Sequence, residues 1–257
     1  MSTKIKTAIV TGGNGGIGKA IVTELIKSNI KTIIVGRNKE KGEQTETEMK
    51  ALGGDVRFVQ LDLSNTIEIQ KFYDEVICHE ESIDILVNNA GISGFMGPVM
   101  DTPLEELHKT FAVNMGGIFQ LTQLVLRKMT PQNWGRIINI SSIAYRRNPA
   151  NSACYNLSKA ALNSFTQTLS AEVGQYGITV NAVAPGLILT DRIKKQRLPG
   201  MAKKAGVSAK EMLNKLTEGT ATGKLTEESD IAYLTNFLAS EQAGSITGEI
   251  IDVAGGA

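Results

Sequence analysis

At 257 residues the chain is long enough for one large α/β domain with a sizeable core. Lys plus Arg at 27 and Asp plus Glu at 26 nearly cancel, which gives no general electrostatic basis for binding nucleic acid or an anionic membrane. Apolar runs are too short for a membrane span or a signal peptide, and with two cysteines and two separated histidines we expect a cytoplasmic protein without a structural disulfide or a catalytic metal.

Short, continuously apolar runs recur along the chain, as is typical of strands buried on both faces of a parallel sheet. We predict strands at 7–11, 32–35, 56–61, 83–87, 136–140, 179–183 and 249–253. Helices are predicted between them at 19–28, 39–52, 67–79, 104–129, 160–175 and 227–239. Strict alternation implies right-handed βαβ crossovers. The prediction is therefore a single doubly wound Rossmann domain over 1–257, with a parallel seven-stranded sheet and helices on both faces.

The loop after the first predicted strand, residues 11–18, reads TGGNGGIG and leads into a helix. Glycines there permit a tight turn and let backbone amides approach a diphosphate at the helix N-terminus. The loop fits two glycine patterns. Gly13, Gly15 and Gly18 satisfy GxGxxG, while Gly12, Gly16 and Gly18 satisfy TGxxxGxG. Either pattern predicts a dinucleotide-binding loop in this strand–helix context.

The end of the second predicted strand indicates which dinucleotide is bound. A cofactor with a free ribose 2′-hydroxyl is typically held by an Asp or Glu at this point. This chain has VGRNK at 35–39 and no carboxylate before Glu40. Gly36 leaves room, and Arg37 can make charge-assisted hydrogen bonds to a 2′-phosphate, which favours NADP(H) over NAD(H). The alternative is that Arg37 stacks on the adenine and tolerates either cofactor.

A tyrosine and a lysine provide the candidate acid–base centre. Tyr155 and Lys159 are four residues apart, so on a helix they project from one face. A phenol loses its proton only near pH ~10, and an adjacent ammonium lowers that value toward the range where acid–base chemistry is useful. The hydroxyl of Ser142 could hold a substrate oxygen against the phenol. The arrangement suits proton transfer to or from a carbonyl or alcohol oxygen.

Residues 187–226 depart from the alternation of strands and helices. The segment is long, irregular and basic, with apolar residues interleaved, and a loop of this length in a compact domain is typically an active-site lid. A solvated basic surface helix is the alternative. The basic residues are Arg192, Lys194, Lys195, Arg197, Lys203 and Lys204.

In order and spacing, these motifs resemble the short-chain dehydrogenase/reductase family, and the resemblance runs from about Lys6 to Gly256. Ser142 stands thirteen residues before Tyr155, the family's usual interval, which favours it over Ser141. A departure is Ala254, where the family often has Asp. Further segments that match are Asp62 after the third strand, NNAG at 88–91, Asn114, Pro185-Gly186 with Thr190, ITG at 246–248 and GG at 255–256.

The resemblance implies a role for each matching residue. Asn114, Ser142, Tyr155 and Lys159 would form the catalytic tetrad, with Tyr155 as general acid or base and Asn114 positioning a water that links Lys159 to solvent. Ser142 and Tyr155 would contact the substrate. The residues implied to contact the cofactor are Gly12, Asn14, Gly16, Ile17, Gly18, Arg37, Asn38, Asp62, Leu63, Asn89, Ala90, Gly91, Tyr155, Lys159, Pro185, Gly186, Ile188 and Thr190.

The implied activity is NADP(H)-dependent interconversion of a carbonyl and a secondary alcohol in a small molecule, by a homo-oligomer (tetramer or dimer). Many relatives reduce β-ketoacyl thioesters on acyl-carrier protein, and they tend to present basic residues where this chain has Asn133 and Tyr176. Arg127, Lys128 and the 192–204 cluster could substitute, so carrier-bound substrates stay an alternative. A non-catalytic NADP(H)-binding sensor is an alternative of another class.

Two arginines follow the candidate catalytic serine, where small residues are common in the family. Arg146 or Arg147 could pair with a carboxylate or phosphate on the substrate. Solvent-exposed arginines at the mouth of the site, or a subunit contact, are equally consistent with the sequence.

Overall fold

The structure is a computed structural model that describes residues 5–190, 193 and 198–257. Its sheet has the strand order β3-β2-β1-β4-β5-β6-β7, and every neighbouring pair is parallel. The strands are β1 (Thr7–Thr11), β2 (Lys31–Gly36), β3 (Val56–Gln60), β4 (Ile85–Asn88), β5 (Gly135–Ile140), β6 (Ile178–Pro185) and β7 (Ile250–Val253). The predicted doubly wound, seven-stranded parallel sheet is confirmed.

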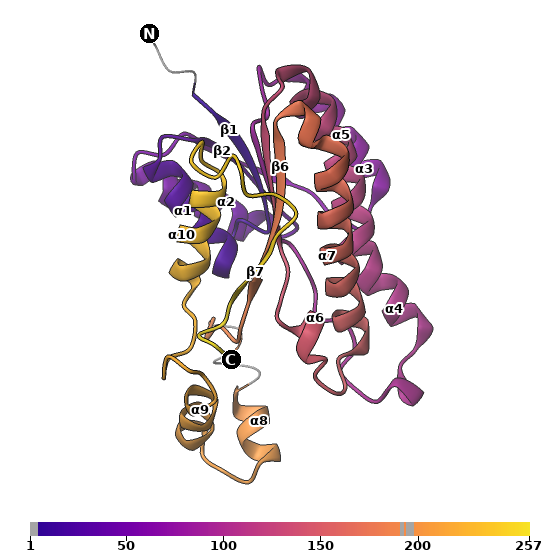
Figure 1. The fold of residues 1–257 in the computed structure, drawn as a ribbon, viewed down its shortest axis with the longest axis vertical. Helices are drawn as coiled ribbons and strands as arrows, with labels where there is room; N and C mark the ends of the chain where they lie inside the picture. Colours follow the sequence, from indigo (N-terminus) through magenta and orange to yellow (C-terminus); the bar gives the residue numbers. More distant parts are fainter. Residues whose placement is uncertain (1–4, 191–192, 194–197) are drawn as a thin grey trace.

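Helices cover both faces of this sheet (Figure 1), with α1, α2 and α10 on one face and α3, α5 and α7 on the other. Within β1, Ala8 and Val10 pack into the first apolar cluster and Ile9 into the second, because successive side chains point to opposite faces. None of the helices that the structure describes is long and apolar enough to span a membrane. The helices are α1 (Gly16–Lys27), α2 (Lys39–Ala51), α3 (Thr66–Glu75), α4 (Leu104–Phe111), α5 (Gly117–Gln132), α6 (Ala144–Arg147), α7 (Ala153–Val173), α8 (Leu198–Lys204), α9 (Ala209–Glu218) and α10 (Glu228–Leu238).

Two predicted helices differ from the observed ones in ways that affect the site. The helix predicted at 104–129 is interrupted by a π-helical turn, Ala112–Gly116, between α4 and α5. At its centre, the side chain of Asn114 is hydrogen-bonded to the main chain of Ile92, so a tertiary contact accompanies the break. The helix predicted at 160–175 begins earlier, at Ala153, and therefore contains both Tyr155 and Lys159.

The segment 187–226 is more regular than predicted, because it contains α8 and α9. These helices lie together at one end of the molecule (Figure 1) and share a small apolar cluster of Leu198, Ala202 and Met212. Ser208 and Glu211 form a capping box at the start of α9, a sequence signal for a helix. Lys203 and Lys204 end α8. The predicted basic residues Arg192, Lys194, Lys195 and Arg197 lie outside the described residues.

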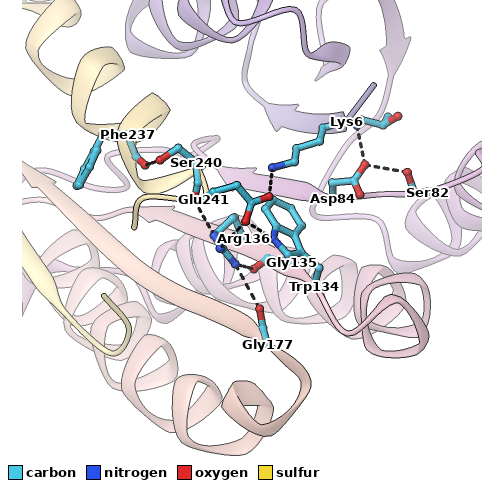
Figure 2. Close-up of polar contacts among 11 residues, drawn as sticks. Lys6, Ser82, Asp84, Trp134, Gly135, Arg136, Gly177, Phe237, Ser240 and Glu241 are labelled. Carbon is cyan, nitrogen blue, oxygen red and sulfur yellow. Dashed lines mark hydrogen bonds and ion pairs between the residues drawn. The ribbon is translucent and has the colours of Figure 1, made fainter. Parts of the chain in front are cut away.

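A cluster of polar side chains joins the amino ends of the strands to the end of α10 (Figure 2). The ring of Trp134 contacts two cations, with its centroid 3.9 Å from Lys6 Nζ and 4.3 Å from Arg136 Cζ. Glu241 accepts hydrogen bonds from Lys6 Nζ at 2.7 Å and from Trp134 Nε1 at 3.0 Å. The guanidinium of Arg136, only 3% exposed, donates to three main-chain carbonyls, those of Gly135, Gly177 and Ser240.

Candidate active site

The candidate site begins where β1 and β4 lie side by side at the centre of the sheet. The chain continues from β1 to one side of the sheet and from β4 to the other, which opens a crevice at the carboxyl ends of these strands. Thr11 Oγ1 accepts hydrogen bonds from the amides of Asn89 (2.9 Å) and Ala90 (3.0 Å). The side-chain amide of Asn89 in turn donates to the carbonyls of Thr11 (2.9 Å) and Gly12 (3.2 Å). These bonds fix the glycine loop against the loop after β4.

The glycine loop has no room for side chains at its points of close approach. A Cβ on Gly12, whose φ is +64°, would lie 2.9 Å from Asn89 Nδ2. A Cβ on Gly18 would overlap the carbonyl oxygen of Gly12. Helix α1 starts at Gly16 without a side-chain cap from the described chain and without an acidic residue in its first turn. Its amide groups and its dipole therefore suit an anionic group, as in a dinucleotide diphosphate.

A first cavity of about 390 Å³ extends from the glycine loop over the ends of β2 and β3. Arg37 and Lys41 line it and bring two positive charges. Lys41 Nζ reaches the glycine loop, because a Cβ on Gly15 would overlap it. Asn38 places Lys41 there by capping α2, with its side-chain oxygen accepting the Lys41 amide at 2.8 Å. Lys41 was not among the residues predicted from the sequence. The signal was its spacing of four from Arg37 across a helix start marked by Asn38.

Asp62 lies at the far side of this cavity, after β3. Burial opposes its ionised form, but hydrogen bonds from the Ser64 amide (2.8 Å) and hydroxyl (2.7 Å) and the nearby Arg37 guanidinium outweigh burial. Together they hold the pKa of Asp62 below its usual range. The first cavity thus has the ionised carboxylate of Asp62 next to the guanidinium of Arg37.

A second cavity, of about 450 Å³, contains the predicted acid–base pair. Ser142, Tyr155 and Lys159 all line it. Lys159 is 3% exposed, and its Nζ donates to the Ile140 carbonyl at 2.7 Å and lies 5.7 Å from the centroid of the Tyr155 ring. Burial lowers the pKa of Lys159 to about 8. A buried ammonium beside a phenol is an arrangement that can stabilise the phenolate.

Ser142 lies at the turn from β5 into α6. Its Oγ accepts the amide of Ala144 at 3.2 Å, and its own proton is donated to no residue that the structure describes. A hydroxyl in that state can donate to a ligand oxygen. Ser141 also lines the cavity, but its hydroxyl is almost wholly buried and has no partner among the described residues.

Asn114 lines neither cavity, because it is fully buried behind Ile92. Its Oδ1 accepts the Ile92 amide at 2.8 Å, and its Nδ2 donates to the Ile92 carbonyl (2.9 Å) and to Ser158 Oγ (3.0 Å). A Cβ on Gly91 would lie 3.3 Å from Asn114 Oδ1 and 3.7 Å from Lys159 Nζ. Asn114 therefore holds the loop after β4 against α7 beside Lys159, and the water it was predicted to position stays a prediction.

The remaining predicted residues divide between the two cavities, which meet at Gly91 and Ile92. The first cavity is lined by Gly12, Asn14, Arg37, Asn38, Asp62, Leu63, Ala90 and Gly91. The second is lined by Ile17, Asn89, Gly91, Ser142, Tyr155, Lys159, Pro185, Gly186, Ile188 and Thr190. Gly16 and Gly18 shape the loop without lining either cavity. In the described part of the chain, no group of three or more His, Cys, Asp or Glu is placed to hold a metal.

The combined site has the shape and chemistry of a dinucleotide site. The glycine cradle would be filled by any Cβ at Gly12 or Gly18, the free end of α1 suits a diphosphate, and the first cavity continues into the one that holds Tyr155. A nicotinamide dinucleotide spanning both cavities would bring its reactive ring beside the phenol.

Known proteins that are similar to this chain include dehydrogenases and reductases. The family described as short chain dehydrogenase matches residues 6–199. The 3-oxoacyl-[acyl-carrier-protein] reductase FabG of Aquifex aeolicus is 35% identical over 252 residues, covering 98% of this chain and 96% of the relative. A crystal structure of a variant actinorhodin polyketide ketoreductase with NADPH superposes with a TM-score of 0.93 at 29% identity, covering 100% of this chain and 98% of the other. An NAD+-bound xylitol dehydrogenase superposes with a TM-score of 0.90 at 28% identity, covering 98% of each chain.

Proposed function

This chain belongs to the short-chain dehydrogenase family, and from that premise we propose that it is an NADP(H)-dependent oxidoreductase that interconverts a carbonyl and a secondary alcohol. The observation that carries the proposal is the single cavity lined by Ser142, Tyr155 and the buried Lys159, which continues into the nucleotide cavity at Gly91. Relatives named as a 3-oxoacyl reductase and a polyketide ketoreductase support the carbonyl chemistry.

The proposed mechanism assigns one task to each side chain. When bound, the reduced nicotinamide supplies a hydride to the carbonyl carbon. Tyr155 donates its proton to the carbonyl oxygen in reduction, and its phenolate takes a proton from the alcohol in oxidation. Ser142 donates a hydrogen bond to the same oxygen, where negative charge develops. Lys159 stabilises the phenolate that remains, and a pKa of about 8 leaves it mostly protonated at neutral pH.

Asn114 completes the proposal as a residue that acts through Lys159. Its hydrogen bonds to Ile92 and Ser158 hold it beside Gly91, which the lysine ammonium also approaches. From this position we expect it to orient a water that returns protons from solvent to the Lys159–Tyr155 pair.

The preference for NADP(H) rests on the charges of the first cavity. Arg37 and Lys41 line it, and no carboxylate stands between the end of β2 and the start of α2. An anionic 2′-phosphate would gain charge-assisted hydrogen bonds there, whereas a bare 2′-hydroxyl would gain little. NADPH and NAD+ both occur among the structural neighbours, so the neighbours do not favour one cofactor over the other. The preference for NADP(H) is therefore inferred from the residues of this chain.

Replacing Arg37 with Ala should weaken NADPH binding by about 10- to 100-fold and NADH binding much less, since only NADPH loses charge-assisted hydrogen bonds. Dissociation constants from cofactor fluorescence would measure this. Lys39→Ala is the matched control, because Lys39 lies two positions after Arg37 at the start of α2 but pairs with Glu43 at 3.8 Å and does not line either cavity. Equal losses for both cofactors in Arg37→Ala would refute the 2′-phosphate contact.

The activity itself is tested with purified protein, NADPH and a panel of β-keto thioesters, free ketones and keto sugars. Consumption of NADPH that depends on a carbonyl compound is the expected result. Tight NADPH binding without turnover on any member of the panel would instead favour the non-catalytic sensor. The panel also separates thioesters from other carbonyl compounds.

Carrier-bound β-ketoacyl thioesters are the second candidate substrate, because of the 35% identity to a 3-oxoacyl-carrier reductase. Two of the basic side chains that could bind an acidic carrier protein already contact other residues of this chain. Lys128 Nζ donates to the Cys78 carbonyl at 3.4 Å, and Arg127 lies over the Tyr73 ring at 5.7 Å. We therefore place free carbonyl compounds first.

We also expect a homo-oligomer. The outer face of α5 and α7 carries apolar side chains that this chain alone leaves exposed. Phe119 is 44% exposed and packs against Phe165, with ring centroids 5.3 Å apart, and Leu157 is 54% exposed. A second copy that covers this face would bury them.

A further inference from the structure

The two arginines that follow Ser142 have different environments in the structure. Arg146 pairs with β7 through a 2.6 Å contact between its Nε and Asp252 Oδ2. Its Nη2 also donates to the Ala257 carbonyl at 3.5 Å. Arg146 therefore holds α6 against the last strand, and its charge already has a partner.

Arg147 lines the cavity that holds Tyr155. It is the last residue of α6, and the next residue, Asn148, adopts a left-handed conformation with φ 45° that ends the helix. No carboxylate that the structure describes forms an ion pair with Arg147. Within the described part of the chain, the cavity thus has an exposed guanidinium without a counter-ion.

Among the described residues that line the cavity, Lys159 is the only other charged one. The ammonium of Lys159 is buried and bonded to the Ile140 carbonyl, and its proposed task is at the phenol. Of these two charged residues, Arg147 is therefore the one that can bind a part of the ligand other than the reacting carbonyl group.

The walls around Arg147 are held in place by hydrogen bonds to main-chain carbonyls. Met96, Pro149 and Ser152 line the cavity together with it. The amide of Gly97 donates to the Asn151 carbonyl at 3.0 Å, and Asn156 Nδ2 donates to the Pro149 carbonyl at 3.1 Å. Mostly apolar walls, with Arg147 as the unpaired cation among the described lining residues, favour a ligand with an apolar body and an anionic end.

We propose that the substrate carries an oxyanion group, a carboxylate or a phosphate, that pairs with Arg147 while its carbonyl group lies at Tyr155. The inference rests on the proposed function and names the substrate class for the same site. A guanidinium presents parallel N–H groups to two oxygens of such a group, which fixes the orientation of the molecule as well as holding it. Orientation by a remote charge is what a reductase needs to present a single face of the carbonyl to the hydride.

The test compares 4-oxo and 5-oxo carboxylates with their methyl esters and with phosphonates of equal chain length, all with NADPH. Hydrogen bonds to charged groups predict that the wild-type kcat/KM for the anionic form exceeds that for the ester by about 10- to 100-fold, mainly through KM. Arg147→Gln should bring the anion-to-ester ratio close to one. Arg146→Gln removes the same charge from the neighbouring residue and should leave the ratio as in wild type. The relative rates with carboxylate and phosphonate identify which anion the site takes.

A binding measurement keeps the inference separate from the activity. Calorimetric titration of the NADPH complex with a 4-hydroxycarboxylate, a pair that cannot react, should show binding that weakens at high salt. It should also weaken in Arg147→Gln and stay unchanged in Arg146→Gln. Equal kcat/KM values for acid and ester in wild type, or an unchanged ratio in Arg147→Gln, would overturn the inference while leaving the carbonyl reductase intact. Absence of turnover with every probe would overturn the proposed function, and the titration would still decide on Arg147.

Discussion

Tyr155→Phe is expected to lower kcat by about 10²- to 10⁴-fold, because it removes the proton that the developing alkoxide needs. The side chain keeps its ring, so the cavity retains its shape and NADPH should bind with nearly unchanged affinity. Steady-state kinetics on the best substrate of the panel and a fluorescence titration with NADPH measure the two effects separately.

Tyr145→Phe provides the matched control for this substitution. Tyr145 lies in α6, close to Ser142 in the sequence, but it is not among the residues that line the cavity. Loss of the Tyr145 hydroxyl should leave kcat near the wild-type value. Turnover retained in Tyr155→Phe, or lost equally in both variants, would contradict the assignment of Tyr155 as the acid.

Lys159→Met should also reduce turnover, by about 10²-fold or more, because the phenolate loses the ammonium that stabilises it. The same substitution has a second, thermodynamic signature. Burial lowers the pKa of Lys159 from its ordinary value of 10.5 to about 8 in the fold, a shift that corresponds to roughly 3 kcal/mol.

The sign of the effect on stability follows from proton counts. Between pH ~8 and ~10.5 the unfolded chain holds the Lys159 proton and the folded chain has released it, so stability from this group rises with pH. Met does not titrate. The free energy of unfolding of the lysine form, relative to Lys159→Met, should therefore increase by about 2 kcal/mol between pH ~8 and ~10.

Urea unfolding at several pH values measures this difference. Both proteins should carry Tyr155→Phe, so that titration of the neighbouring phenol does not contribute. A difference that stays constant over this range, or one that falls as pH rises, would show that Lys159 is not desolvated in the fold.

The parts of the site that could be predicted from the sequence are those set by short spacings. The glycine loop and the pair Tyr155 and Lys159 each lie within one turn or one strand–helix junction, so local geometry decides them. The order of apolar runs was likewise enough for the doubly wound sheet, because each βαβ unit has only one favoured hand.

The parts that could not be predicted depend on distant residues. The break at Asn114 accompanies its bonds to Ile92 and Ser158, which are 22 and 44 positions away. Arg146 and Arg147 are adjacent in the sequence, and they differ through contacts such as the one between Arg146 and Asp252, 106 positions away. The start of α2 at Lys39 was predicted correctly, but the place of Lys41 in the site depends on the reach of its side chain to Gly15, 26 positions earlier in the chain.

The cluster around Trp134 has a consequence for how this chain can diversify. The buried guanidinium of Arg136 donates hydrogen bonds to main-chain carbonyls, and these carbonyls persist whatever side chains the neighbouring positions carry. It lies at the amino ends of the strands, whereas the loops that line the cavity of Tyr155 follow their carboxyl ends. Mutational libraries directed at residues 93–97 and 147–152 leave this anchor untouched, so a large share of their members should still fold and be open to selection for new substrates.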